Sequence, residues 1–198
     1  MMLRASVDAA LVRRLAGRID MRTFLRERTR DRGLVGSMYD ATVTGLDSEP
    51  SSSGGGHDDA VLSVIGAPLT SAMSDLYARV LNWRVDDRYA LLGRVRWEWG
   101  GGRSTHEVVG DLRSFLAIDP RTRVLVTHGA SDLVTPYFEN QLILDQMPAF
   151  AGPDRLKLAV YGGGHMFYSR EASRRAFRED ARTLYRAVEE AAVPASRG

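Results

Sequence analysis

The chain has 198 residues, a length that fits one domain and suffices to bury a hydrophobic core. Its 27 basic and 25 acidic residues give a net charge of +2, and no basic patch is interleaved with stacking aromatics, so we expect no nucleic-acid binding. The lack of cysteine excludes a disulfide scaffold, a thiolate nucleophile and a cysteine-based zinc site, and no apolar run is long enough to predict a membrane span.

The first half of the chain is predicted to be mostly helical. An apolar stripe with charged residues between its members predicts a helix over residues 7–30. A polar loop follows, and its Ser-Ser-Ser-Gly-Gly-Gly run (51–56) is interpreted as a surface insertion in preference to an interdomain linker. Helical spacing resumes over residues 58–81, where Pro68 is expected to break the helix in two. The His-Asp-Asp run (57–59) fits a solvated helix start better than a metal cluster, because acids suit a helix N-terminus.

The second half alternates between helix and strand. The expected elements are a short amphipathic helix with inward Val108, Val109, Leu112, Phe115 and Leu116, strands over 124–127 and 156–161, and helices over 137–147 and 170–192. Ser169 is a plausible N-cap for the last helix. That helix is expected to pack one apolar face on a sheet through Phe177, Ala181, Leu184 and Val188.

This order of elements predicts an α/β protein with a mostly helical region over residues 1–118 and a βαβα region over residues 119–198. Parallel sheets need both faces covered and several strands. Two parallel strands are therefore too few, and we expect the remaining strands of the sheet to lie elsewhere.

An acid and a histidine follow the two predicted strands. Asp132 lies in a loop that leaves the first strand, and His165 follows three glycines after the second. In α/β-hydrolases, the acid and the histidine of a Ser…Asp…His triad occupy such positions. Alone, Asp132 is better explained as a turn or capping residue. The strand–Gly-His–helix context favours catalytic ancestry for His165 over a buried structural role, whereas His128 is more simply explained as a packed residue.

A nucleophile does not accompany this pair. A nucleophile elbow reads Gly-x-Ser-x-Gly between a strand and a helix, and no segment of the chain fits it. The nearest candidates, Ser37, Ser104 and Ser131, each lack the second glycine at the required position. Without a serine and oxyanion donors, an Asp–His pair has no proton to take and no oxyanion to stabilise.

The chain resembles the bacterial branch of the serine carboxypeptidases, peptidase family S10. The resemblance rests on Gly36-Ser37-Met38-Tyr39-Asp40-Ala41-Thr42-Val43-Thr44-Gly45, Trp97-Glu98-Trp99-Gly100, Asp111-Leu112-Arg113, Val124-Leu125-Val126 through Pro136-Tyr137-Phe138, Leu144-Asp145, and Gly164-His165-Met166-Phe167-Tyr168. It covers nearly the whole chain but only the C-terminal portion of the family's length. It implies the last strands and helices of an α/β-hydrolase fold, preceded by part of a helical cap.

The resemblance also implies roles for three residues. Asp132 would be the triad acid, His165 the triad base, and Met166 a contact for the C-terminal residue of the substrate. It implies a peptide substrate with a free C-terminus, no metal or other cofactor, and a periplasmic or secreted location, although residues 1–8 lack the apolar core of a signal peptide. The nucleophile elbow, the oxyanion-hole glycines and the carboxylate-binding residues lie upstream in the family, so this chain alone is expected to be inactive.

Two other functions are compatible with the same residues. The chain could be a non-enzymatic remnant or binding module of α/β-hydrolase origin, which would fold alone and bind a partner or peptide. It could also belong to an α/β-hydrolase that acts on esters or small amides, and a preference for esters over peptides with free C-termini would distinguish that case. The sequence leaves the oligomeric state open.

Overall fold

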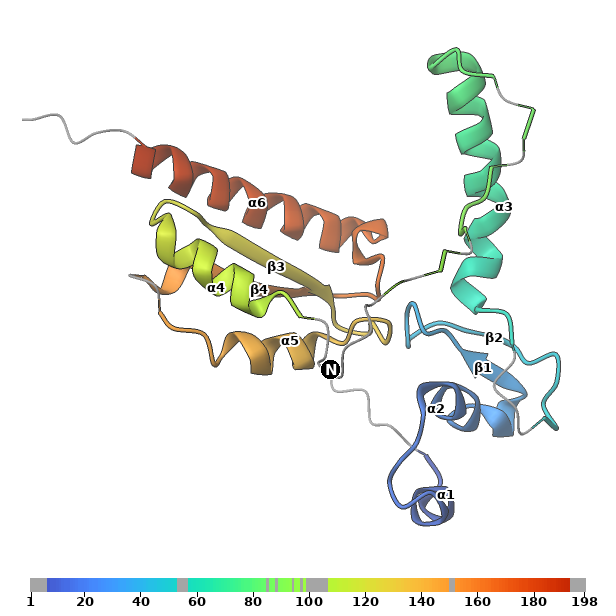
Figure 1. Ribbon diagram of the computed structural model, residues 1–198. Helices are drawn as coiled ribbons and strands as arrows, with labels where there is room; N and C mark the ends of the chain where they lie inside the picture. The colour runs from blue at the N-terminus through green and yellow to red at the C-terminus, as the bar shows by residue number, and fades with distance from the viewer. Residues whose placement is uncertain are drawn as a thin grey trace, which may run out of the picture. The chain divides into compact units, whose positions relative to one another are not determined.

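The computed structural model describes residues 7–52, 57–84, 86–87, 89–93, 95–96, 98, 107–149 and 152–192. The fold is a mixture of helix and sheet, with small parallel and antiparallel sheets, and it divides into two compact units, Met1–Gly100 and Gly101–Gly198 (Figure 1). Trp97, Trp99, Gly100, Ser104 and residues 53–56 of the Ser-Gly run, which the sequence analysis names, lie outside the described residues.

The first unit begins with two short helices where the sequence predicted one, so the prediction of a continuous helix over residues 7–30 is wrong. Helix α1 (Ala9–Arg14) and helix α2 (Met21–Glu27) are separated by Ala16 and Gly17, whose φ angles of 50° and 74° are left-handed and end α1. Asp20 then starts α2, because its side chain accepts a 3.0 Å hydrogen bond from the Thr23 amide. The stripe of apolar residues in the sequence therefore spans the end of one helix and the start of the next.

An antiparallel hairpin, which the sequence analysis did not predict, follows α2. After a 3₁₀ turn (η1, Arg30–Arg32), strand β1 (Leu34–Gly36) pairs with strand β2 (Thr44–Leu46). A buried ion pair joins α2 to the end of this hairpin: Arg26 Nε lies 2.9 Å from Asp47 Oδ2, with side chains 3% and 1% exposed. Strands of three residues are too short for a period-two pattern to emerge from the sequence.

Helix α3 (Ala60–Asp75) starts where the sequence analysis placed a helix start, and Asp59 is its N-cap. Asp59 Oδ1 accepts from the amides of Val61 (2.9 Å) and Leu62 (3.3 Å). The same carboxylate accepts from the Ser37 hydroxyl at 2.7 Å and from the Met38 amide at 2.8 Å. One side chain therefore caps the helix and ties the hairpin loop to it.

We expect Asp59→Ala to lower the free energy of unfolding of the first unit by about 2 kcal/mol, because it removes a cap and several hydrogen bonds at once. Urea denaturation followed by far-UV circular dichroism measures this change. Asp58→Ala, at an exposed neighbouring position, is the matched control and should leave the midpoint unchanged. Equal effects of the two variants would contradict the capping role of Asp59.

Pro68 does not break α3, so this prediction is also wrong. The helix runs through the proline and continues as a π-helical turn, η2 (Leu76–Val80). Proline removes the hydrogen bond to the carbonyl four residues earlier, that of Val64. Val64 is 73% exposed, so water can satisfy that carbonyl. By length and composition alone, Ala60–Val80 could cross a membrane, but a single such helix is weak evidence, since core helices and signal sequences meet the same criterion.

The second unit is a βαβ arrangement with an additional helix at each end. It consists of α4 (Val109–Ile118), β3 (Val124–Gly129), α5 (Tyr137–Leu144), a 3₁₀ turn η3 (Pro153–Arg155), β4 (Leu156–Tyr161), a second turn η4 (Phe167–Ser169) and α6 (Glu171–Ala192). Strands β3 and β4 pair in parallel, with Val124 opposite Leu156 and Gly129 opposite Tyr161. Helix α6 lies on one side of the strand pair, and α4 and α5 lie on the other (Figure 1).

The predicted strands and helices of this half are confirmed, with two corrections. Ser169 is not the N-cap of α6, because the chain still forms the turn η4 there and the helix begins at Glu171. The prediction of which α4 side chains point inward is only partly correct. Leu116 is fully buried, but Val108 and Phe115 are 71% and 57% exposed.

The core of the second unit is aromatic. Ala159 and Tyr161 from β4 pack with Phe167 from η4, and Phe177 from α6 packs against this cluster, as the sequence predicted. The rings of Tyr161 and Phe167 stack with centroids 4.9 Å apart. The Tyr161 hydroxyl donates a 2.8 Å hydrogen bond to Asp180, so α6 is held to β4 by a polar contact as well as by apolar packing.

Candidate functional site

The two loops that carry Asp132 and His165 lie at the same end of the parallel strand pair. Their backbones continue the ladder beyond the strands: the Ala130 amide donates to Tyr161 O at 2.8 Å, and the Ser131 amide donates to Gly163 O at 2.9 Å. Gly163 adopts a φ of +122°, which only glycine accommodates readily, and this turns the chain toward His165. Residues 33 positions apart in the sequence are thereby brought together.

Asp132 serves both as a turn residue and as the partner of a histidine. Its Oδ1 accepts from the backbone amides of Val134 (2.8 Å) and Thr135 (3.1 Å), which is the turn role that the sequence analysis considered. Its Oδ2 accepts from the Thr135 hydroxyl at 2.8 Å and lies 3.0 Å from His165 Nδ1. The turn holds the carboxylate in one orientation and directs its second oxygen at the imidazole.

The Asp132–His165 pair has one buried member and one accessible member. The Asp132 side chain is 3% exposed, and the His165 side chain is 39% exposed. Because a carboxylate only accepts hydrogen bonds, the proton in this pair is on His165 Nδ1. This assigns the tautomer in which Nε2 is the basic nitrogen, the arrangement that a general base needs.

Thr135 and His128 support the pair, and sequence reasoning missed the first of them. Thr135 Oγ1, which donates to Asp132, also lies 3.4 Å from His165 Nδ1. His128 is 8% exposed, and its Nδ1 lies 3.1 Å from the Thr135 carbonyl oxygen, so it donates to the loop that carries the acid. His128 is a packed residue, as the sequence favoured. The sequence signal that could have identified Thr135 is its position three residues after the predicted acid.

The environment of Asp132 lowers its pKa below the ordinary aspartate value. Burial alone would raise the pKa, but the hydrogen bonds from Thr135, His165 and Val134 stabilise the carboxylate and together outweigh burial. The folded chain therefore binds this proton less tightly than the unfolded chain does.

We expect the stabilising effect of Asp132 to depend on pH in one direction. The contribution is fully present above the ordinary aspartate pKa of about 3.9 and is lost as the pH falls through the lower pKa of the folded state. The difference in free energy of unfolding between the natural chain and Asp132→Asn should therefore shrink below about pH 4. Urea denaturation between pH 3 and 7 measures it. A difference that stays constant over this range would contradict the hydrogen bonding described here.

The remaining predicted residues have the following positions. Met166 follows His165 directly, is partly buried, and accepts a 2.9 Å hydrogen bond from the Ser169 amide through its carbonyl. Ser37 is fully buried and bonded to Asp59, and Ser131 is 5% exposed beside the acid. Within the described part of the chain, no group of three or more histidine and carboxylate side chains is placed to hold a metal ion.

Comparison with known proteins gave no match: no family model, no curated protein and no solved structure is significantly similar to this chain.

Proposed function

We propose that Asp132 and His165 are the acid and the base of a Ser–His–Asp triad, in a chain that corresponds to the C-terminal part of a serine-type carboxypeptidase of peptidase family S10. The observation that carries this proposal is the 3.0 Å contact between Asp132 Oδ2 and His165 Nδ1, made by a buried, hydrogen-bonded carboxylate and an accessible imidazole. A buried acid that orients a histidine through Nδ1 is the arrangement found in triads of this type.

The mechanism assigns separate tasks to the two residues. His165, through Nε2, takes the proton from a serine hydroxyl as it attacks the scissile carbonyl, and then gives it to the leaving amino acid. Asp132 keeps the ring in the required tautomer and stabilises the imidazolium, while Thr135 and His128 position the acid. Met166 is proposed to contact the C-terminal residue of a peptide. The same proposal includes a longer protein that has the α/β-hydrolase fold.

The nucleophile is proposed to lie outside these 198 residues, because no Gly-x-Ser-x-Gly segment occurs in the sequence. On this proposal the chain by itself neither reacts with a serine-hydrolase probe nor releases an amino acid from a peptide. The complete site would need strands that pair with β3 or β4 and that supply the serine and the oxyanion donors.

The test begins with the natural protein. A C-terminal tag at the native locus allows the product to be purified and its N-terminus to be read by mass spectrometry. The product is then treated with a fluorophosphonate probe and with N-blocked dipeptides that carry a free or an amidated C-terminus. We expect a longer chain containing Gly-x-Ser-x-Gly that is labelled and cleaves only the free-acid peptide, and we expect His165→Gln to abolish both reactions.

Two results would overturn the proposal. A native product that consists of these 198 residues and neither labels nor cleaves would identify a non-enzymatic chain. Labelling of the 198-residue chain itself that is lost in His165→Gln would show that one of its own serines, with Ser104 and Ser131 as the first candidates, is the nucleophile. Cleavage of esters in preference to peptides would support the triad assignment, but it would change the proposed substrate from peptides to esters.

A further inference from the structure

The glycine loop before His165 is held on two sides. On one side, the carbonyl oxygens of Tyr161 and Gly163 accept from backbone amides of the opposite loop at 2.8 and 2.9 Å. The carbonyl oxygen of Gly162, between them, accepts a 2.6 Å hydrogen bond from Ser173 Oγ, on the first turn of α6. The loop is therefore also attached to a helix that supplies no residue to the candidate site.

Ser173 belongs to the face of α6 that packs on the strand pair (Figure 1). It is 7% exposed, and Phe177, one turn later, packs against the aromatic core. A Cβ on Gly162 would lie 3.7 Å from Ser173 Oγ, so the helix and the loop are in close contact. A buried hydroxyl needs a hydrogen-bond partner, and the Gly162 carbonyl provides it.

The peptide group that Ser173 holds has unusual freedom to rotate. It joins Gly162 to Gly163, and neither residue has a Cβ to restrict the backbone rotation on its side of the peptide. Water can hydrogen-bond to such a carbonyl, but it does not fix the direction of the group. A buried donor at 2.6 Å selects one orientation of the peptide, and with it the φ of +122° at Gly163.

The conformation at Gly163 decides where His165 lies, because only Gly164 separates them. A side chain at Gly163 could not provide the same restriction, since its Cβ would lie 3.0 Å from Arg170 Cδ and Nε. The 3.0 Å contact between His165 Nδ1 and Asp132 Oδ2 requires that the ring be placed to within a few tenths of an ångström. An unheld peptide before Gly163 would not secure that placement.

We propose that Ser173 is a positioning residue for His165. Its hydrogen bond to Gly162 holds the glycine loop in the conformation that presents Nδ1 of the imidazole to Asp132. The importance of this role for catalysis rests on the function proposed above, whereas the placement of the ring is testable without any reaction. Helix α6 thus covers one face of the strand pair and also sets the position of the proposed base.

The tautomer of His165 reports its placement directly. Histidine labelled with nitrogen-15 in the 198-residue chain gives separate ring-nitrogen signals for the four histidines, and His165→Gln assigns those of His165. At a pH where the imidazole is neutral, we expect the Nδ1–H form in the natural chain, because Asp132 can only accept. Ser173→Ala should shift the ring toward the Nε2–H form, which a solvated imidazole favours.

Three further changes separate positioning from a general loss of stability. Ser173→Thr keeps the hydroxyl and should retain the Nδ1–H form of His165. Ser114→Ala is the matched control, because Ser114 Oγ donates to the Gly110 carbonyl at 3.0 Å on an exposed part of α4, and its loss should leave the tautomer unchanged. Gly162→Ala restricts the same peptide rotation by a Cβ, at a residue whose φ is not left-handed. Added to Ser173→Ala, it should restore part of the Nδ1–H population, and this rescue adds no atom to α6.

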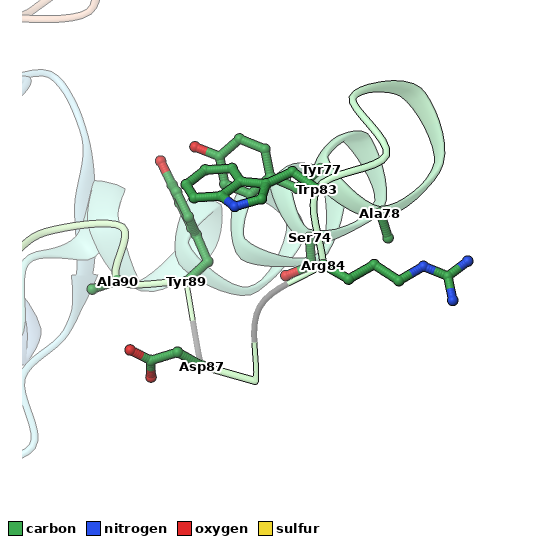
Figure 2. Close-up of a pocket in the computed structure, with 8 residues that line it drawn as sticks. All are labelled: Ser74, Tyr77, Ala78, Trp83, Arg84, Asp87, Tyr89 and Ala90. Carbon is green, nitrogen blue, oxygen red and sulfur yellow. The ribbon is translucent and has the colours of Figure 1, made fainter.

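The first unit supplies an internal reference for these variants. All three tryptophans of the chain precede Gly101, where the second unit begins. Trp83 lies edge-to-face against Tyr77, with ring centroids 5.1 Å apart, at the C-terminal end of α3 (Figure 2). Tryptophan fluorescence should therefore be the same in the natural chain and in Ser173→Ala, which confines the change at His165 to the second unit.

The longer product expected from the native locus gives a second readout. Ser173→Ala should lower its kcat about tenfold and leave KM nearly unchanged, because a catalytic group misplaced by about 1 Å can cost about 100-fold in rate. An unchanged tautomer in Ser173→Ala, or an equal shift in Ser114→Ala, overturns the proposal. If no longer product hydrolyses peptides, the function proposed above fails, and the tautomer comparison still decides the role of Ser173.

Discussion

Replacing Gly129 with alanine is expected to unfold the second unit. The added Cβ would lie 2.0 Å from the carbonyl oxygen of Gly164 and 2.6 Å from that of Gly163. Both are backbone atoms, so no change of rotamer can relieve the overlap. The two loops would have to separate, and the hydrogen bonds that join them through Ala130 and Ser131 would break.

The expected loss in free energy of unfolding is on the order of 4 kcal/mol, a large part of the stability of a typical domain. Urea denaturation followed by circular dichroism measures it, with Gly110→Ala as the matched control. Gly110 lies in α4, and its nearest neighbour for an added Cβ is Glu107 Oε1 at 3.8 Å. That variant should be stabilised by about 0.5–1 kcal/mol, because alanine favours helix over glycine. Equal midpoints for the two variants would show that the loops do not approach this closely.

The same change should also separate the acid from the histidine. A hydrogen-bonded Nδ1–H of His165 gives a downfield proton resonance, which Asp132→Asn would shift or remove. We expect Gly129→Ala to remove this resonance even under conditions in which helix content is retained. Its persistence would mean that the contact between Asp132 and His165 does not depend on the packing of the two loops.

Replacing Arg155 with methionine should destabilise the second unit by about 3 kcal/mol. Arg155 is 5% exposed and donates to the carbonyl oxygens of Leu116 at 2.8 Å, Asp119 at 2.5 Å and Thr122 at 3.2 Å. One guanidinium therefore satisfies carbonyls at the end of α4 and in the turn that leads to β3. Methionine fills similar volume but leaves these buried acceptors without the donor.

Thermal unfolding of Arg155→Met measures this loss, and two further variants define its cause. Arg155→Lys should recover only part of the stability, because an ammonium group cannot reproduce the planar arrangement of guanidinium donors. Arg121→Met removes an arginine side chain that is 72% exposed and pairs with Asp119, so it should leave the midpoint unchanged. A wild-type midpoint for Arg155→Met would contradict the role assigned to these hydrogen bonds.

The sequence predicted those elements whose pattern is long or strongly apolar. Strands β3 and β4 each contain an apolar run, Val124-Leu125-Val126 and Leu158-Ala159-Val160-Tyr161, and α6 repeats its apolar residues over 22 positions, so all three elements were predicted. The prediction from sequence failed where one or two residues decide whether a helix ends or continues. The left-handed Ala16–Gly17 pair divides the first helix, and α3 continues through Pro68 where Val64, four residues earlier, is exposed. The β1–β2 hairpin was not predicted, because each of its strands has three residues.

By itself, the sequence identified Asp132 and His165 as the candidate acid and base, because an acid and a Gly-His that follow neighbouring parallel strands emerge at the same end of the sheet. The tertiary structure alone decided how they meet. It showed that Asp132 uses one oxygen for its turn and the other for His165, and that Thr135 and His128 support it. A hydrogen bond between residues 30 or more positions apart requires that donor and acceptor be placed to within a few tenths of an ångström. No pattern along the chain encodes atomic positions with that precision.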